Sequence, residues 1–464
     1  MIIFSNKRCF RFFMLFMLVG VIVLTSCSHG KQPDYTSIAI SKGKRILVIA
    51  PHPDDETLGV GGTIYQAVKN SDDVKVVIVT SGDSFTRAAE ILTKHPIPGI
   101  KDYIRLGYIR HSESRKALES LGVKPDNIIF LGYADTSLRF LWDSFWDKPH
   151  VSGDIRSAYS PYDDIYQLKV PYMGQALETQ LANIIEQYKP TDIYYPSTMD
   201  AHPDHWAAGA FTEYAAYVSN YTGELHAYLI HHKLWPSLWA MNKNAPEMPP
   251  ADIKNIGGFK WEEDKLSDDA IDAKLQAVKK YKTQIDVMAP FMYGFIRNSE
   301  SFMQPQVSVI PELTAVFDVP GQITQNKFML IKNIGDNEFK RIEEPSANIV
   351  QLNSASANNT LYIALKLHSK PEASLSYEMH IRLLYPMSVK RIDLLYKKGK
   401  WQYENKAGNS IVINDINGNV YDKVWLCCNL PISTPRYLYI NADISKGDKM
   451  IDHLPLYMFK LQAQ

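Results

Sequence analysis

The sequence predicts an α/β domain with a parallel sheet, followed by an all-β domain. Two observations support this fold class. Up to about residue 305, short apolar runs alternate with segments of helical periodicity, which favours right-handed βαβ units and a parallel sheet. Beyond that point helical periodicity disappears, and short strand-like runs separated by turn residues replace it. A chain of 464 residues is long enough for two or three domains.

The first predicted strand and helix enclose an acidic turn. Five consecutive apolar residues at 46–50 are typical of a strand buried on both faces, and apolar periodicity at 58–68 predicts a helix. The turn between them, residues 51–56, reads Pro-His-Pro-Asp-Asp-Glu. Three adjacent acids beside an imidazole would repel one another at neutral pH, and a bound divalent cation would relieve that repulsion. The plainer alternative is that Asp54 and Glu56 only cap the helix.

The following segments continue the alternation and then interrupt it. Strands are predicted at 74–80 and 127–131, with a helix at 104–121 between them, whereas residues 84–101 are polar and contain prolines. Residues 136–172 form a long stretch rich in aromatic residues and turn residues. Loops of this length are often lids or binding loops. The stretch therefore either stacks on a sugar ring or is a packed insertion.

A second strand end carries a similar cluster of side chains. A helix predicted at 175–188 leads to a strand at 192–197, which runs into Asp-Ala-His-Pro-Asp-His at residues 200–205, and a helical segment follows at 206–218. Open α/β sheets bind their ligands at the carboxyl ends of the strands. Two such clusters therefore predict one shared site.

The remaining elements complete the two domains. A strand is predicted at 225–230, and Ser267 is expected to cap a helix that continues to about residue 285. Asp-Ile-Asn-Gly-Asn at 415–419 is a predicted turn, and Lys-Lys-Gly-Lys at 397–400 predicts a hairpin. The spacing of the late strands predicts a β sandwich. These strands are expected at 361–367, 379–385, 392–396, 401–403, 436–440 and 455–461.

Charge and cysteine content exclude some classes of protein. Formal net charge is zero and the sequence pI is about 7.2, so no basic field would attract nucleic acid. The four cysteines lie at positions 9, 27, 427 and 428, a distribution that shows no disulfide framework.

The N-terminus has the pattern of an export signal. Basic residues at 7–11 precede an apolar run at 12–24, which is short for a membrane-spanning helix. The run ends in Leu-Thr-Ser-Cys, which resembles a bacterial lipobox and implies cleavage before Cys27 and lipidation of its sulfur. Residues 1–27 would then be a signal peptide and 28–42 a tether. The mature chain would be an exported lipoprotein, anchored by its lipid to a membrane on the periplasmic or cell-surface side. The alternative is an uncleaved N-terminal anchor.

The two acidic turns have the residue types of a catalytic metal site. A catalytic zinc ion typically has three protein ligands and one open position. An enzyme of this kind also needs a carboxylate that takes a proton from water, and a donor where negative charge develops on the attacked carbonyl. A histidine that does not bind the metal is suited to the second role and to protonating a leaving amine. Spacing alone does not decide which of the candidates binds the metal: His52, Asp54, Asp55, Glu56, His202, Asp204 and His205.

The two motifs resemble those of the PIG-L/LmbE-like family of metal-dependent de-N-acetylases. The resemblance rests on Pro-His-Pro-Asp-Asp-Glu at 51–56 and His-Pro-Asp-His at 202–205, and it extends to Arg110-x-x-Glu113 and to Leu-Gly-Tyr-Ala-Asp at 131–135. It covers about residues 43–305 and implies a Rossmann-like parallel sheet with helices on both faces. Residues 306–464 would be the β-rich accessory domain.

The resemblance also assigns roles to individual residues. It implies that His52, Asp55 and His205 bind the metal, that Asp54 is the general base, and that His202 stabilises the oxyanion and acts as the acid. Supporting roles are implied for three further residues: Arg110 and Asp135 would bind the sugar hydroxyls, and Glu56 would support the metal ligands. The metal would be Zn²⁺, although Fe²⁺ would also accept this ligand set.

The expected function is therefore zinc-dependent hydrolysis of the N-acetyl group of an N-acetylated amino sugar or glycoconjugate. Three departures bear on the substrate: the long stretch at 136–172, the added β domain, and Asp200, which stands where some relatives carry an aromatic residue that assists catalysis. One alternative is an amidase that acts on a larger N-acyl group or on a thiol conjugate of an amino sugar. The other is a non-catalytic glycan-binding lipoprotein.

Overall fold

The computed structural model describes residues 36–461 except 39–41, 234, 237–238, 256, 314–315, 317, 334–341, 343, 386–387, 405–418, 433–436 and 448. Residues 36–464 belong to one compact unit. The predicted signal peptide with Cys27, most of the predicted tether and most of the turn predicted at 415–419 lie outside the described residues. Among those that are described, no helix combines the length and the apolar character needed to span a bilayer.

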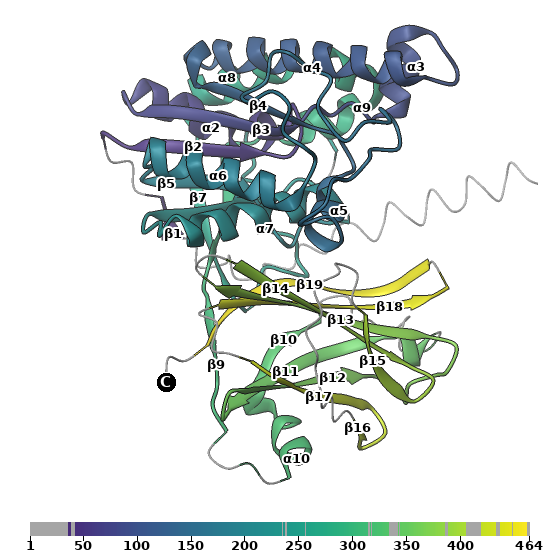
Figure 1. The fold of residues 1–464 in the computed structure, drawn as a ribbon. Helices are drawn as coiled ribbons and strands as arrows, with labels where there is room; N and C mark the ends of the chain where they lie inside the picture. The colour runs from purple at the N-terminus through teal and green to yellow at the C-terminus, as the bar shows by residue number, and fades with distance from the viewer. Residues whose placement is uncertain are drawn as a thin grey trace, which may run out of the picture. The chain divides into compact units, whose positions relative to one another are not determined.

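An eight-stranded sheet forms the centre of the α/β region (Figure 1). Its strands, in spatial order, are β1 (Thr36–Ser37), β7 (Phe259–Lys265), β8 (Ser299–Pro305), β6 (Glu224–Tyr228), β5 (Asp192–Pro196), β2 (Arg45–Ala50), β3 (Asp73–Thr80) and β4 (Ile128–Tyr133). The five strands from β6 to β4 are parallel, as predicted. The prediction of a wholly parallel sheet is wrong, because β8 runs antiparallel to both β6 and β7 and makes the sheet mixed.

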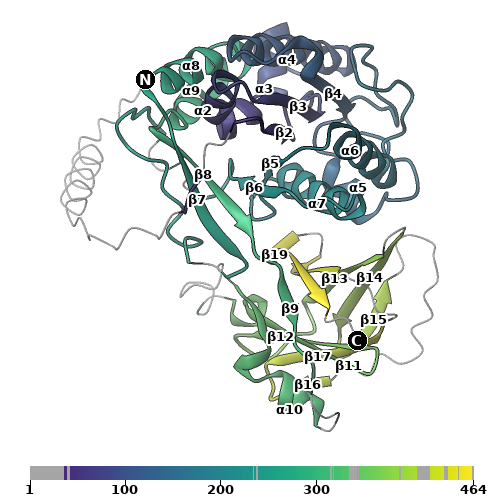
Figure 2. The ribbon, with the colours of Figure 1, turned by 90° about the vertical axis from the view of Figure 1, so that its left-hand side faces the viewer.

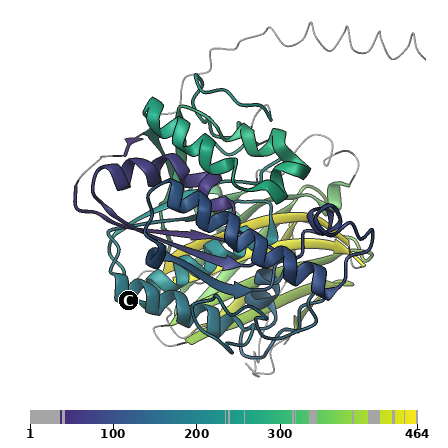
Figure 3. The same ribbon diagram turned by 90° about the horizontal axis from the view of Figure 1, so that it is seen from above.

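Helices cover both faces of this sheet, as expected (Figures 1 and 2). The first group contains α2 (Asp55–Lys69), α4 (Ile100–Ser120), α8 (Asp268–Val278) and α9 (Lys282–Gly294), and Figure 3 shows it in front of the strands. The other group contains α5 (Leu138–Asp143), α6 (Gly174–Tyr188) and α7 (Pro203–Val218). A further helix, α3 (Thr86–Thr93), lies in the polar stretch for which none was predicted.

Local sequence explains where one of these helices begins and how closely another approaches the sheet. Ser267 caps α8, since its side chain accepts a hydrogen bond from the Ala270 N–H at 3.2 Å. The helix predicted from Ser267 to about 285 is wrong in its length: α8 ends at Val278 and α9 begins four residues later. Gly59 lets α2 approach β6, because a Cβ there would lie 2.6 Å from the Tyr228 ring.

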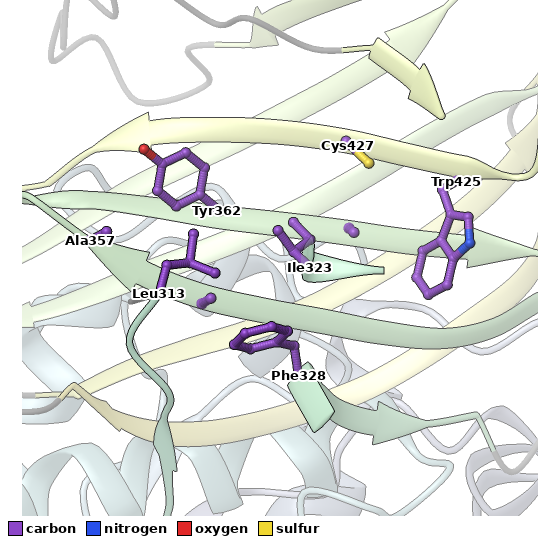
Figure 4. Close-up of a cluster of buried hydrophobic side chains, with 9 residues drawn as sticks. Leu313, Ile323, Phe328, Ala357, Tyr362, Trp425 and Cys427 are labelled. Atoms are coloured by element: carbon purple, nitrogen blue, oxygen red, sulfur yellow. The ribbon is translucent and has the colours of Figure 1, made fainter. Parts of the chain in front are cut away.

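Two sheets make up the β region, and Figure 1 shows them as stacked layers. One sheet contains β10 (Met329–Lys332), β11 (Ile349–Ala357), β12 (Thr360–Leu367), β17 (Trp425–Pro431) and β16 (Asn419–Tyr421). The other contains β15 (Lys400–Glu404), β14 (Ser388–Lys397), β13 (Ser376–Tyr385), β18 (Tyr437–Lys446), β19 (Lys449–Leu461) and β9 (Ser308–Ile310). The predicted hairpin is present as β14–β15. Buried side chains that include Leu313, Phe328, Tyr362 and Trp425 form a core against the first sheet (Figure 4).

The aromatic stretch at 136–172 is a packed insertion. Trp142, Tyr162 and Tyr172 are buried within it, and the Tyr162 hydroxyl donates to Asp83 at 2.8 Å. The Trp142 ring also packs edge-on against Tyr439 of β18, with the ring centroids 5.5 Å apart. The insertion therefore joins the α/β region to the β region, whereas Phe140, Tyr159 and Tyr166 of the same stretch are exposed, and stacking of these rings on a sugar stays a prediction.

Candidate active site

The loop after β2 is held in an unusual conformation by the residues around it. Asp54 has a φ of 130° and a ψ of −32°, a backbone conformation that side chains other than glycine rarely adopt. The Asp54 N–H donates to Glu56 Oε2 at 3.0 Å. The hydroxyls of Ser114 and Tyr281 both donate to Glu56 Oε1. Glu56 thus links the Asp54 backbone to Ser114 and Tyr281 and holds the loop in place.

Three donor atoms from the two predicted motifs form a small triangle. His52 Nδ1 lies 3.1 Å from Asp55 Oδ2 and 3.1 Å from His205 Nε2, and His205 Nε2 lies 3.2 Å from Asp55 Oδ2. An ion that binds nitrogen and oxygen at about 2.0–2.2 Å can contact all three atoms of a triangle with these edges. The donor set also has the composition of a catalytic zinc site, two imidazoles and one carboxylate. The residues therefore fit the metal that the sequence implies.

Two buried acids of the second motif position the site. Asp200 Oδ2 lies 3.3 Å from His205 Nδ1, an arrangement that orients a ligating histidine. The same Asp200 oxygen accepts from the backbone N–H groups of Ile230 and His231 at 2.9 Å. Asp204 accepts from the N–H groups of Thr136 and Leu138, and so it fixes the start of the aromatic insertion beside the site.

A pocket of about 300 Å³ opens beside the triangle. Six residues predicted for the site line it: His52, Asp54, Asp55, Arg110, Asp135 and His202. His205 and Glu56 are completely buried and lie behind these residues. The structure therefore brings together every predicted site residue that it describes.

Burial and neighbouring charges shift the pKa values of the acids in the loop, as they stand without a bound cation. Burial raises the pKa of Asp54 to about 8, although Arg110, whose Nη2 lies 3.3 Å from Asp54 Oδ2, opposes the rise. Burial acts in the same direction on Asp55, but His205 and His52 overcome it and hold the pKa of Asp55 well below its usual value. The two neighbouring acids thus differ in pKa. Asp54 is suited to accept a proton near neutral pH, whereas Asp55 stays charged.

The pKa values of two histidines of the site, His205 and His202, are shifted in opposite directions. Burial lowers the pKa of His205, but Asp55 and Asp200 outweigh this effect and raise it to about 9. Burial and the nearby His205 and His52 lower the pKa of His202 to about 3. His202 is therefore a neutral imidazole that lines the pocket, while the ring of His205 lies between two carboxylates.

Sequence reasoning missed several residues of the site. His231 lines the pocket, and its ring centroid lies 4.8 Å from that of His205. A nitrogen of His231 groups with ligand atoms of Asp55 and His205, with all three atoms within 4.8 Å of one another. Gln284 and Phe291 of α9 also line the pocket. His231 follows the end of a predicted strand, as the two acidic turns do, and this position was the available signal.

Two imidazoles and one carboxylate that converge beside a pocket are the donor set typical of a metal-dependent hydrolase. Residues 47–216 match the model of the PIG-L family, described as GlcNAc-PI de-N-acetylase. The matched residues contain both motifs, Pro-His-Pro-Asp-Asp-Glu at 51–56 and His-Pro-Asp-His at 202–205, and the chain is similar to deacetylases, which are hydrolases that act on N-acetyl amides.

Relatives with assigned activities include two deacetylases. A 1D-myo-inositol 2-acetamido-2-deoxy-alpha-D-glucopyranoside deacetylase of Mycobacterium sp. (strain KMS) is 26% identical over 260 residues, which cover 53% of this chain and 75% of the relative. A diacetylchitobiose deacetylase of Thermococcus kodakarensis is 34% identical over 97 residues, 21% of this chain and 32% of the relative. Among solved structures, the A40926 pseudoaglycone deacetylase Dbv21 aligns with a TM-score of 0.37 at 20% identity, covering 56% of this chain and 96% of that one.

Proposed function

We propose that the chain is a zinc-dependent enzyme that removes the N-acetyl group from an N-acetylated amino sugar or glycoconjugate. The observation that carries the proposal is the triangle of His52, Asp55 and His205 donor atoms, with the Asp54 carboxylate on the wall of the same pocket. The family match and the deacetylase activities of the relatives support the choice of reaction.

His52, Asp55 and His205 would hold the metal. When bound, zinc or Fe²⁺ would act as a Lewis acid toward the substrate carbonyl and lower the pKa of a coordinated water. Asp135 Oδ1 lies 3.1 Å from His52 Nε2, so Asp135 orients a metal ligand as well as lining the pocket.

Asp54 would take the proton from the attacking water as the general base. Arg110 Nη2 also donates to the Pro53 carbonyl at 2.7 Å, and so it holds both the Asp54 side chain and the loop that carries it. His202 would donate its Nε2–H to the oxyanion. Because its low pKa leaves the ring without a second proton to give, the proton that Asp54 takes from the water would pass to the leaving amine. His202 Nδ1 accepts from the Asp204 N–H at 3.2 Å, which leaves Nε2 as the nitrogen available to the substrate.

The sequence supports an exported enzyme that is anchored in a membrane. In this proposal signal peptidase cleaves before Cys27, lipid is attached to the Cys27 sulfur, and residues 28–42 tether the catalytic region. Growth with an alkyne fatty acid should label the wild-type chain, whereas Cys27→Ser should remain unlabelled and uncleaved. Equal labelling of the two chains would contradict lipidation at Cys27.

Acetate release tests the enzymatic part of the proposal. Purified residues 28–464 are incubated with zinc and a panel of N-acetylated sugars, glycans and non-sugar amides. We expect acetate release from an amino sugar that stops when zinc is chelated and returns when zinc is restored. Release of a larger acyl group with no acetate would indicate the amidase alternative. Binding of a glycan without release of any acyl group would indicate a non-catalytic binding protein.

A further inference from the structure

His231 reaches the pocket beside the triangle of metal-donor atoms, although it belongs to neither predicted motif. It lies three residues after β6 and is only partly buried, whereas His205 is completely buried. The ring centroid of His231 lies 4.8 Å from that of His205 and 5.3 Å from that of His202. The side chain of His231 is therefore open to a ligand in the pocket.

The second motif holds the backbone of His231 in place. Asp200 Oδ2 accepts from the His231 N–H at 2.9 Å, and the same oxygen lies 3.3 Å from His205 Nδ1. The Ala201 N–H donates to the His231 carbonyl at 2.7 Å. One carboxylate thus positions both the His205 ring and the segment that carries His231, so the two histidines keep a fixed separation.

Stacking holds the ring of His231. The ring lies parallel to that of Phe291 of α9, with an interplanar angle of 4° and the ring centroids 5.2 Å apart. Stacking of this kind restrains the imidazole through its face and leaves its edge, which carries both nitrogens, free to form hydrogen bonds. Within the described part of the chain, no hydrogen bond engages either ring nitrogen of His231. The ring is thus fixed in position and available to a ligand.

His202 and His231 lie beside two different edges of the triangle. A nitrogen of His202 groups with donor atoms of His52 and His205, and these three atoms lie within 4.8 Å of one another. A nitrogen of His231 groups in the same way with donor atoms of Asp55 and His205, again within 4.8 Å. A substrate atom that approaches the triangle from the pocket would therefore have an imidazole beside each of these two edges.

The surroundings of His231 favour a role as a hydrogen-bond donor over a role as a fourth metal ligand. A catalytic zinc site typically has three protein ligands and keeps one position open. A ligating histidine usually bonds a carboxylate or carbonyl through its other ring nitrogen, as His205 does with Asp200. The ring of His231 has no such partner among the described residues, because His231 contacts Asp200 through its backbone.

We propose that His231 is a second catalytic imidazole, which donates a hydrogen bond to the acyl oxygen of the substrate together with His202. Either nitrogen of a neutral imidazole can carry the proton of that hydrogen bond. Negative charge develops on the acyl oxygen as water attacks, so a donor fixed beside it stabilises the transition state more than the bound substrate. No proton leaves His231 in this step. The inference rests on the proposed function and deepens it.

Replacement of the imidazole by groups without nitrogen tests this role. His231→Phe keeps an aromatic ring against Phe291 and His231→Leu is a smaller replacement, whereas His231→Gln keeps an N–H donor. On the best substrate from the acetate panel, whichever of the Phe and Leu variants is folded should lower kcat roughly 10²–10³-fold with little change in KM, the usual cost of one oxyanion donor. His231→Gln should recover part of that loss. An unchanged kcat in a folded Phe or Leu variant would overturn the inference.

His226→Gln is the matched control. His226 is a buried histidine of β6, with Nδ1 2.7 Å from Glu262, and it does not line the pocket. At a temperature where thermal unfolding shows it to be folded, this variant should keep the kcat and KM of the wild type. A loss of kcat equal to that of the His231 variants would show that disturbance of this segment causes the effect, and it would overturn the inference.

Binding of methylphosphonate separates this inference from the proposed reaction. This anion has the tetrahedral shape and the negative charge of an acetyl group under attack, and it contains no sugar. By calorimetry, zinc-loaded wild type should bind it about tenfold more tightly, or better, than zinc-loaded His231→Phe or His231→Leu, because the variants lack one hydrogen bond to a charged group. Zinc content, measured by mass spectrometry, should be equal in all three proteins.

Each other outcome counts against one of the two statements. Equal affinities, or no binding of methylphosphonate to the wild type, would overturn the inference alone. Loss of zinc from the His231 variants would identify His231 as a metal ligand and would overturn the inference as well. The expected difference in affinity, without acetate release from any sugar, would overturn the proposed reaction alone.

Discussion

The pocket of the α/β region and the sheet of β13, β14, β18 and β19 each contain a buried cluster of histidines and carboxylates. In the β cluster, His380 Nδ1 lies 2.7 Å from Asp393 and His380 Nε2 lies 3.3 Å from Asp443. Arg382 donates to Asp393 at 2.9 Å, and His453 bonds to Asp443. The two clusters are similar in composition, so composition alone would not tell them apart.

The difference lies in how the atoms are arranged. In the pocket, nitrogen and oxygen atoms of His52, Asp55 and His205 lie within 3.2 Å of one another, and His52 and Asp55 line a cavity. In the β cluster, each ring nitrogen of His380 has its own carboxylate. Groups of described residues close enough to share an ion occur around the pocket and include none from the β cluster. Convergence on a cavity therefore separates a reactive site from a structural ion-pair network.

Removal of a ligating histidine should give the largest effect and separates the two clusters most clearly. His205→Ala should lose its bound zinc and lower acetate release roughly a thousandfold or more, because the metal provides several kcal/mol of transition-state stabilisation. Zinc is measured by mass spectrometry after dialysis. His380→Ala is the control and should retain its zinc. Equal zinc content in the His205 variant and the wild type would disprove the assignment of this ligand.

Replacement of the proposed base should separate metal binding from catalysis. Asp54→Asn should keep the zinc content of the wild type and lower kcat by roughly 10²–10⁴, the usual contribution of a general base. Steady-state acetate release and zinc content of the same sample are the two measurements. A rate close to that of the wild type would show that another group takes the proton.

Replacement of a histidine in the β cluster should affect stability and not catalysis. In His380→Ala, Asp393 and Asp443 lose the imidazole they share, while Asp393 keeps Arg382 and Asp443 keeps His453. The two lost hydrogen bonds to charged groups should cost roughly 1.5–3 kcal/mol each. The free energy of unfolding from urea titration should fall by about that amount, with kcat/KM unchanged at a temperature where the variant is folded. A large loss of kcat/KM there would mean that the β cluster acts on the site.

The smallest predicted effect concerns the hydrogen bond that joins the two regions. Tyr439 of β18 and Tyr195 of β5 both donate to Glu213 of α7, at 2.8 and 2.9 Å. Burial raises the pKa of Glu213 to about 7, and the two tyrosine hydroxyls limit the rise. Because its pKa is raised on folding, Glu213 favours the folded state below its unfolded pKa. That contribution is lost as pH rises through about 7, by roughly 3 kcal/mol at most.

The pH dependence of unfolding provides the check. Between pH 4.5 and 7, Glu213→Gln should lose less stability than the wild type, since an amide does not titrate. Tyr195→Phe keeps Glu213 and serves as a comparison in which the decline persists. Parallel curves for wild type and Glu213→Gln would show that Glu213 ionises at its ordinary pKa.

Local sequence predicted the parallel strands of the sheet and the two motifs, because each is encoded by a run of neighbouring residues. The strand β7 was missed because Glu262 and Asp264 make it look polar. In the structure Glu262 lies 2.7 Å from His226 and Asp264 accepts from Thr63 at 2.7 Å, so both acids are buried as partners. The break between α8 and α9 was missed for a similar reason, because Tyr281 turns inward there to bond Glu56.

The pocket residues that the sequence did not predict are brought there by contacts between distant segments. Gln284 lies 230 residues after Asp54 in the sequence, and the bonds of Thr283 to Glu113 of α4 hold the start of α9, the helix that carries Gln284. The role of Asp200 was hidden because it accepts from the backbone at 230 and 231, which no side-chain pattern reports. The predicted residues lie in local motifs, whereas His231 and Gln284 reach the pocket through the packing of distant segments.

The backbone conformation of Asp54 suggests a compromise between the stability of the fold and catalytic activity. Its φ of 130° would suit glycine, and its buried carboxyl has a raised pKa, so this residue makes the fold less stable in two ways. Selection for heat resistance alone would be expected to replace it and yield a sturdier but inactive protein. An aspartate at such a position is therefore better explained by its chemistry than by stability, and a library designed to raise thermal stability without loss of activity should hold position 54 constant.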